Sequence, residues 1–267
     1  MDVVSLVVLF LAGCVTGFLA GLFGVGGGII LVPTLLWYFS EHQVSSLVAT
    51  HLALGTSLLV VTFTSLSSSI RYSRNGHIIG RAVLFIGLAS IVGAFLGSGV
   101  AASLQGRTLQ EIFGGVVGVS AIRLLLEGGK TDPSQSPDVT PKYLLLTGLI
   151  TGLVSSLAGV GGGVLSIPIM YHLLSFPLKK AIGTSSATIV VTALAAVAGY
   201  IFRGWGNPLL PGNTLGFVDY LHAAPLIVGS LPFAILGAKQ AHLMQVHTLR
   251  KVFAVFLMVV AIRILMF

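Results

Sequence analysis

The chain consists of two copies of one pattern, and this duplication constrains its fold more than any other feature. Four pairs of segments match in the same order along the two halves: FGVGGGIILVP at 23–33 with AGVGGGVLSIP at 158–168, ALGTS at 53–57 with AIGTS at 181–185, LQGRTLQEIF at 104–113 with MQVHTLRKVF at 244–253, and AIRLL at 121–125 with AIRIL at 261–265. Chance agreement at four ordered places is implausible. The duplication predicts two equivalent structural units.

Each copy contains five apolar segments. They lie at about 3–22, 29–39, 47–70, 82–102 and 108–126, and again at about 143–158, 164–174, 181–202, 221–238 and 252–267. Charged residues make up 8% of the chain, against about 25% in soluble domains, and the mean hydropathy is +1.02. We therefore expect an all-α polytopic membrane protein with about eight membrane-spanning helices. A soluble globular fold and a nucleic-acid-binding function are excluded.

A polar stretch, EGGKTDPSQSPDVTP at 127–141, separates the two copies. Its Pro, Gly and Ser content is typical of a linker. The sequence thus predicts a first membrane repeat at 1–126, a linker at 127–141 and a second membrane repeat at 142–267. No Lys or Arg precedes Arg71, which argues against a cleaved signal peptide, so we expect the first apolar segment to stay in the membrane.

The positions of Lys and Arg predict the topology, because these residues gather on the cytoplasmic side of membrane proteins. If each copy makes an odd net number of crossings, one face holds Arg71, Arg74, Arg81, Arg123, Lys130, Lys142, Lys179, Lys180, Lys239, Arg250 and Lys251, and the other holds Arg107, Arg203 and Arg263. Parallel copies would largely erase this bias. We therefore expect an inverted repeat in the cell inner (plasma) membrane, with the basic face cytoplasmic and both termini outside.

The second apolar segment of each copy is too short to cross a membrane. Residues 29–39 extend about 16 Å as an α-helix, whereas the hydrocarbon core is about 30 Å thick. We expect a half-helix in each copy, preceded by a glycine-rich break near the middle of the membrane. Thr56 and Ser57 come about nine residues into their helix, roughly 14 Å deep, and should lie near the same level.

A glycine-rich break before a half-helix directs several backbone N–H groups and the positive helix end toward one point, which suits a small anion. The hydroxyls of ALGTS and AIGTS are further donors. The predicted substrate-binding residues are Gly24, Val25, Gly26, Gly27, Gly28, Thr56, Ser57, Gly159, Gly161, Gly162, Gly163, Thr184 and Ser185. The alternative is structural: glycines also let helices touch, as we expect of Gly13, Gly17 and Gly21, and hydroxyls also bond to their own helix.

Groups that could couple transport to protons are scarce. All seven acidic residues lie at termini or in loops, so no intramembrane carboxylate relay is expected. His51 is the candidate coupling residue and His172 a second option, although each ring could instead be a neutral, hydrogen-bonded histidine. Cys14 is interpreted as a packing residue. The sequence lacks the motifs of membrane-embedded hydrolases, so we expect no catalytic residue, metal site or cofactor.

The sequence resembles the TauE/SafE sulfite exporters, also called the TSUP permeases, over nearly its whole length. The segments that carry the resemblance are GLFGVGGGIILVP at 21–33, HLALGTSL at 51–58, RYSRNG at 71–76, SLAGVGGGVLSIP at 156–168, KAIGTSSA at 180–187, GYIFRGW at 199–205 and LRKVFAVFLMVVAIRIL at 249–265. In distant thiosulfate-importing relatives, cysteines contact the substrate. The single Cys14 lies outside the glycine motifs, which counts against that chemistry.

This resemblance implies a bacterial inner-membrane permease for small anions, mostly sulfur-based, such as sulfite and organosulfonates. We expect a secondary transporter that exports such an anion by alternating access at a central site between the repeats. The membrane potential favours outward movement of an anion by about 2.3 kcal/mol per charge per 100 mV. Proton-coupled import, a passive anion channel, and a membrane enzyme or assembly subunit without transport are the alternatives. The expected partners are the small anion and membrane lipid, with homo-oligomerisation left open.

Overall fold

The computed structural model describes residues 3–104 and 139–245 continuously, with isolated residues between 108 and 137 and between 247 and 262. The described chain is α-helical and contains no β-strand. Its elements are α1 (Val3–Phe23), α2 (Gly28–Glu41), α3 (Ser46–Arg74), α4 (Gly80–Ser103), α6 (Pro141–Ala158), α7 (Gly163–Pro168), the π-helical turn η1 (Ile169–Leu173), α8 (Leu178–Gly204) and α9 (Tyr220–Leu243). The expected all-α class is confirmed.

Six of these helices are long and apolar enough to cross a membrane: α1, α3, α4, α6, α8 and α9. The protein is thus polytopic, as the sequence predicts. The predicted count of about eight spans is not confirmed, because the fifth apolar segment of each copy, at 108–126 and 252–267, lies mostly outside the described residues. Most of the predicted linker at 127–141 also lies outside them.

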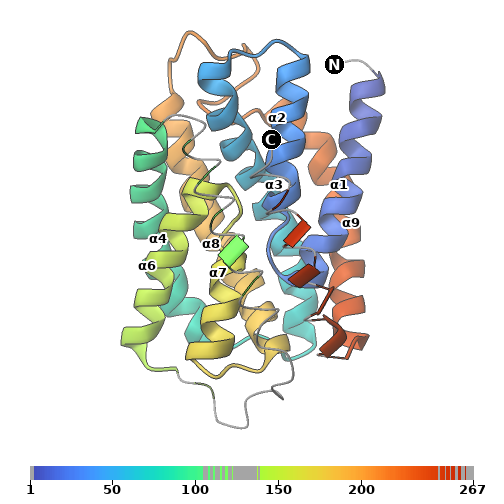
Figure 1. Ribbon diagram of the computed structural model, residues 1–267, viewed down its shortest axis with the longest axis vertical. Helices are drawn as coiled ribbons and strands as arrows, with labels where there is room; N and C mark the ends of the chain where they lie inside the picture. The colour runs from blue at the N-terminus through green and yellow to red at the C-terminus, as the bar shows by residue number, and fades with distance from the viewer. Residues whose placement is uncertain are drawn as a thin grey trace.

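The long helices form two close pairs on either side of a central pair (Figure 1). In one outer pair, α1 runs parallel to α9, and a Cβ added to Gly13, Gly17 or Gly21 would collide with the α9 backbone. In the other, α4 runs parallel to α6 with the same kind of contact, for example Gly152 against the backbone of Ser90. Glycines at these positions allow the two helix axes to approach closely. The packing role expected of Gly13, Gly17 and Gly21 is confirmed.

The two copies are inverted and interlocked. The equivalent helices α1 and α6 begin at opposite ends of the molecule (Figure 1), and each pairs with the last described long helix of the other copy. Matching tyrosines make matching hydrogen bonds: Tyr72 Oη donates to Gly21 O at 2.9 Å, and Tyr200 Oη donates to Ser156 O at 2.8 Å. A pseudo-two-fold arrangement therefore relates the two halves down to single hydrogen bonds.

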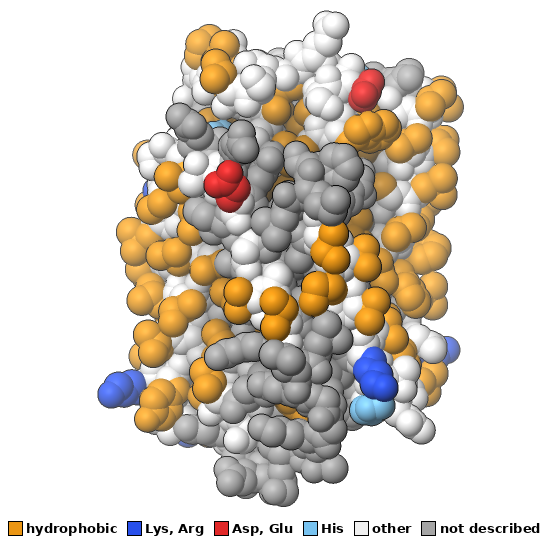
Figure 2. Space-filling model, viewed as in Figure 1, with side chains coloured by type: hydrophobic (Ala, Val, Ile, Leu, Met, Phe, Trp, Pro, Cys, Tyr) orange, Lys and Arg blue, Asp and Glu red, His pale blue; other side chains and the backbone are white. Residues whose placement is uncertain are grey.

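The two ends of the molecule differ in charge. At the end where α3 and α9 finish and α4 and α8 begin, the Lys179 ammonium donates to His242 O at 2.7 Å, and the His77 and His242 rings lie 5.1 Å apart. We call this the basic end. On the face seen in Figure 2, most of the visible Lys and Arg side chains lie at that end, whereas the visible acidic side chains lie toward the opposite end. The structure thus separates charge along its long axis.

Candidate functional site

The chain breaks between α1 and α2 and again between α6 and α7. We call residues 24–27 the first break and residues 159–162 the second break. Left-handed φ angles occur at the same three places in each: 66°, 86° and 89° at Gly24, Gly26 and Gly27, and 68°, 87° and 92° at Gly159, Gly161 and Gly162. Side chains strongly disfavour such φ values, so glycine is required. The predicted half-helices, broken at the glycine motifs, are confirmed.

The two breaks lie directly against each other. A Cβ added to Gly28 would collide with Gly159 O and would lie 2.6 Å from Val160 Cα, and a Cβ added to Gly163 would lie 2.6 Å from Val25 Cα. The first residue of each half-helix therefore touches the break of the other copy. Val25, Ile29 and Val160 also belong to one buried apolar cluster. The duplicated motifs meet in the interior of the protein.

Serine side chains hold the two breaks in place. Ser57 Oγ on α3 donates to Gly159 O at 2.8 Å, and Ser185 Oγ on α8 donates to Gly24 O at 3.1 Å. Both serines are fully buried. Each copy thus fixes the break of the other copy through an equivalent side chain, and the predicted Ser57 and Ser185 are brought to the breaks.

The adjacent threonines contact different partners. Thr56 Oγ1 accepts a hydrogen bond from Asp219 N at 2.9 Å, and Thr184 Oγ1 accepts one from Ile79 N at 3.1 Å. Asp219 and Ile79 are the N-caps of α9 and α4. The two threonines therefore hold the starts of neighbouring helices, one residue away from the serines that hold the breaks.

The first break offers unpaired backbone donors. Ile30 N and Leu31 N donate to Gly27 O, whereas the amides of Gly26 to Ile29 have no acceptor within the part of the chain that the structure describes. Helix starts leave such donors free and carry positive potential, which favours an anion. Ser65 Oγ, 3.2 Å from a Cβ added to Gly26, is 1% exposed and has no partner among the described residues. The sequence gives no signal for Ser65, because this residue lies outside the duplicated motifs.

The second break resembles the first, but the helix that follows it is shorter, with six residues in α7 against 14 in α2. Leu165 N and Ser166 N donate to Gly162 O. Ser155, whose Cβ would lie 3.4 Å from a Cβ on Gly162, is 1% exposed, and its hydroxyl has no partner among the described residues. The short α7 passes at Pro168 into the π-turn η1. A π-turn frequently marks a functional site.

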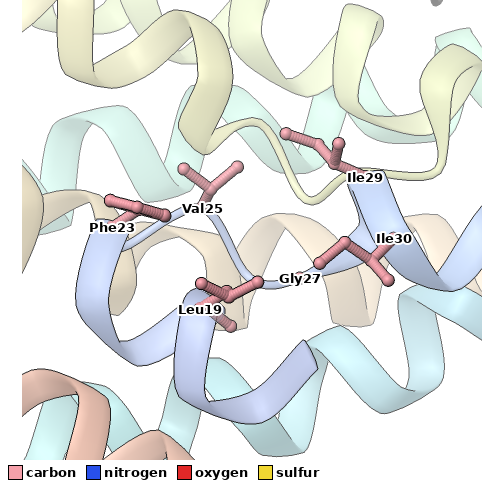
Figure 3. A pocket seen from close by; sticks show the side chains of 7 residues that line it. Leu19, Phe23, Val25, Gly27, Ile29 and Ile30 are labelled. Carbon is pink, nitrogen blue, oxygen red and sulfur yellow. The ribbon is translucent and has the colours of Figure 1, made fainter. Parts of the chain in front are cut away.

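A small cavity lies beside the first break (Figure 3). Its volume is about 10 Å³, and it is lined by Leu19, Ala20, Phe23, Val25, Gly27, Ile29 and Ile30. A space of roughly this size is the smallest that holds one water molecule. The cavity therefore cannot accept an oxyanion in this conformation, and the side chains in Figure 3 close around the break.

Comparisons with known proteins agree with this architecture. A model of the Sulfite exporter TauE/SafE family matches residues 9–264. The chain belongs to this family. It is 34% identical to a probable membrane transporter protein of Haemophilus influenzae over 94% of this chain and 95% of that protein. Probable membrane transporter proteins of Xylella fastidiosa and Bacillus subtilis (YunE) are 28% and 26% identical over 99% and 98% of this chain, and 97% of each relative is covered. No solved structure matches the chain.

Membership of the TauE/SafE family confirms the resemblance seen in the sequence. The family and these relatives are membrane transporters and not enzymes, so this chain is a multi-pass membrane transporter. These relatives are known as probable membrane transporters, without a stated substrate.

His51, the predicted coupling residue, lies away from the contact between the breaks of this TauE/SafE protein. Its Nε2 is 3.0 Å from Ala101 O near the end of α4, and its ring lies 5.2 Å from the Phe217 ring. Its buried Nδ1 has no partner among the described residues. Cys14 packs against Gly229 of α9. The side chain of His172 is not among the side chains that the structure describes. A coupling role for His51 stays a prediction.

One expectation about acidic residues needs correction. Asp219 lies in a loop, as the sequence suggests, but it is only 1% exposed. The loop folds back between α3 and α8: Phe217 O lies against Gly55, and Phe217 N donates to Tyr200 O at 3.2 Å. Glycine at 55 permits this approach, because a side chain there would collide with the loop. The protein therefore does contain a buried carboxylate.

Proposed function

We propose that this TauE/SafE protein is a secondary transporter that moves a small sulfur-containing anion, such as sulfite or an organosulfonate, by alternating access. The anion binds where the two glycine breaks meet. The observation that carries this proposal is the reciprocal contact of the breaks, with unpaired amides at Gly26 to Ile29 and the buried Ser65 hydroxyl beside them. Irregular backbone at membrane depth is tolerated where it lines a substrate cavity.

Each predicted site residue then has a definite part. The amides of Gly26, Gly27 and Gly28 and those of Gly161, Gly162 and Gly163 donate to the anion. Gly24, Val25 and Gly159 shape the contact between the breaks, and Ser57 and Ser185 hold it. Thr56 and Thr184 link the site to the starts of α9 and α4.

Inverted symmetry supplies the alternating access. The hairpin of α1 and α2 enters from one end, and the hairpin of α6 and α7 enters from the other (Figure 1). Rocking one half against the other opens the shared site first to one end and then to the other, as in other inverted-repeat transporters. The basic end is cytoplasmic in this proposal, and the topology expected from the sequence has both termini outside the cytoplasm.

Export follows from the family description and from the membrane potential, which drives anions outward. An interior without acidic residues, as the sequence predicts, would favour export over proton-coupled import. Asp219 removes that premise, because its carboxylate is buried. A proton-linked carrier is therefore the second candidate within the same class.

Counterflow in liposomes tests the proposal. Purified protein should exchange labelled sulfite or isethionate across the bilayer at a rate that saturates with concentration. Gly27→Ala should abolish exchange, because residue 27 has a left-handed φ and its new Cβ would lie 3.2 Å from Thr16 O. Gly80→Ala is the matched control, since a Cβ at residue 80 meets nothing within 4 Å. Fast, linear flux would indicate a channel, and no flux of either probe would contradict the proposal.

A further inference from the structure

An aspartate and a histidine form a close pair at the start of α9. Asp219 Oδ2 lies 2.6 Å from His222 Nδ1, and Asp219 Oδ1 accepts from His222 N at 3.0 Å. The Asp219 side chain is 2% exposed and that of His222 is 20% exposed. A carboxylate so far removed from water and paired with one imidazole is a common proton-binding arrangement within membrane transporters.

The fold does not require this pair. In the other half, Ile79 takes the place of Asp219: its amide donates to Thr184 as that of Asp219 donates to Thr56. Ala82 stands three residues later, where α9 has His222. Helix α4 begins without any side-chain cap. An acid and a histidine at only one of two equivalent helix starts point to a role beyond capping.

The pair is linked to the second break through two neighbouring residues of α3, and it contacts the far part of the helix that begins at the first break. Asp219 N donates to Thr56, which lies ten residues into α3 and thus about 15 Å from its start. The next residue, Ser57, holds Gly159 of the second break. The His222 ring lies 5.0 Å from the Tyr38 ring, near the end of α2, and α2 begins at the first break.

Other titratable groups near the pair are few among the described residues. From α2, Tyr38 contacts His222, and His42 stacks on the Tyr38 ring at 4.1 Å. From α3, His51 contacts Phe217, two residues before Asp219. Cys14 on α1 lies against Gly229, two turns further along α9. Arg203 on α8 is bonded to Ser98 and Phe95 O of α4. No described basic side chain neutralises the carboxylate except His222.

We propose that the Asp219–His222 pair is the site at which this transporter binds a proton together with its anion. The inference rests on the proposed transport of an anion, and it takes the second candidate, the proton-linked carrier, in place of export driven by the membrane potential. When His222 takes a proton from water, the pair changes from a net charge of −1 to zero. Because a negative charge near the breaks opposes a bound anion, the proton and the anion favour each other's binding. Such linkage is reciprocal, so proton and anion move in the same direction, and both leave when the site opens to the other side.

The test separates exchange from proton-driven accumulation. Liposomes containing the full-length protein receive isethionate, a sulfonate that stays ionised through the neutral range, or sulfite if only sulfite exchanges. Counterflow is measured at equal pH on both sides, and accumulation is measured with the outside acidic. The variants are Asp219→Asn and Asp219→Ser, both good N-caps, and His222→Gln. His42→Gln is the control, because its ring contacts Tyr38 and not Asp219.

Wild type and His42→Gln should show both activities. The Asp219 variants should keep counterflow but lose about tenfold or more of the proton-driven accumulation. His222→Gln keeps the negative charge of Asp219, so it should lose the accumulation and also weaken counterflow. Full accumulation in these variants would overturn the proposal. Loss of counterflow in both Asp219 variants would also overturn it, because the pair would then be structural. A wild type that exchanges the anion without responding to the pH gradient would overturn it as well. A wild type that exchanges neither probe would instead contradict the transport function.

Discussion

The loop before α9 and the loop before α4 occupy equivalent places in the two halves, yet they differ in chemistry. Both present a backbone amide to a threonine of the facing helix, from Asp219 to Thr56 and from Ile79 to Thr184. Only the loop before α9 adds a buried acid and a histidine partner. We infer that the fold requires the shared hydrogen bond from amide to threonine. The acid and the histidine, which only one loop has, are then free to serve function.

The contact between the breaks is made by equivalent residues of both halves, and its stability should be the most sensitive to substitution. Gly28→Val and Gly163→Val each push a side chain into the backbone of the opposite break. We expect each to cost about 3 kcal/mol or more, or to prevent folding. Size-exclusion profiles and melting curves in detergent would measure this. A variant that melts like wild type would show that the two breaks do not touch as described.

The threonine contacts should cost less and should match each other. Thr56→Val and Thr184→Val keep the side-chain shape but leave the amide of Asp219 or of Ile79 without an acceptor. An unsatisfied buried donor costs about 1–3 kcal/mol, so we expect similar falls in melting temperature for the two variants. If one substitution were neutral, the equivalence of the two loops would be broken.

Copying one loop onto the other separates fold from function. The double variant Asp219→Ile with His222→Ala gives α9 the residues that begin α4. We expect a stability loss no larger than the roughly 1 kcal/mol of a lost N-cap, with counterflow retained and proton-driven accumulation lost. Melting curves and liposome assays on the same preparation would check this. A protein that fails to fold would mean that the acid is structural.

The smallest effect concerns His77, which takes the place of Phe217 two residues before the helix cap. Burial, with His242, Lys179 and Lys180 nearby, lowers the pKa of His77 below its ordinary value of 6.5. The unfolded chain therefore binds the proton more readily, and stability falls as pH drops through about 6.5. His77→Phe should make the melting temperature less sensitive to mild acid. An unchanged pH dependence would show that His77 does not contribute to it.

Local sequence signals predicted the features that depend on chain length and glycine. The eleven-residue apolar segments were too short to span, and left-handed turns at Gly26 and Gly161 follow from motifs that only glycine satisfies. The spacing of Gly13, Gly17 and Gly21 predicted close helix packing in the same way. These properties depend on residues that are close together in the sequence, so the sequence alone predicts them.

Features that depend on tertiary contacts were not predictable in this way. Asp219 is in a loop, and its burial arises from the approach of Phe217 to Gly55, far away in the sequence. The unpaired hydroxyl of Ser65 becomes apparent only when Gly26 is placed beside it. The threonine partners are set by loops of the opposite half. A duplicated motif indicates where a site lies, but it does not identify the atoms that line the site.

The central claim is that an anion binds between the two breaks, and equilibrium binding of sulfite to purified protein tests it most directly. At about 100 times its dissociation constant, a ligand should stabilise the wild type by about 2.7 kcal/mol. Ser65→Ala should weaken binding by about fivefold, the loss of one buried hydrogen bond. Ser103→Ala, at an exposed hydroxyl near the end of α4, should leave it unchanged. Equal affinity in wild type and Ser65→Ala, with a binding signal that also survives Gly27→Ala, would contradict the account.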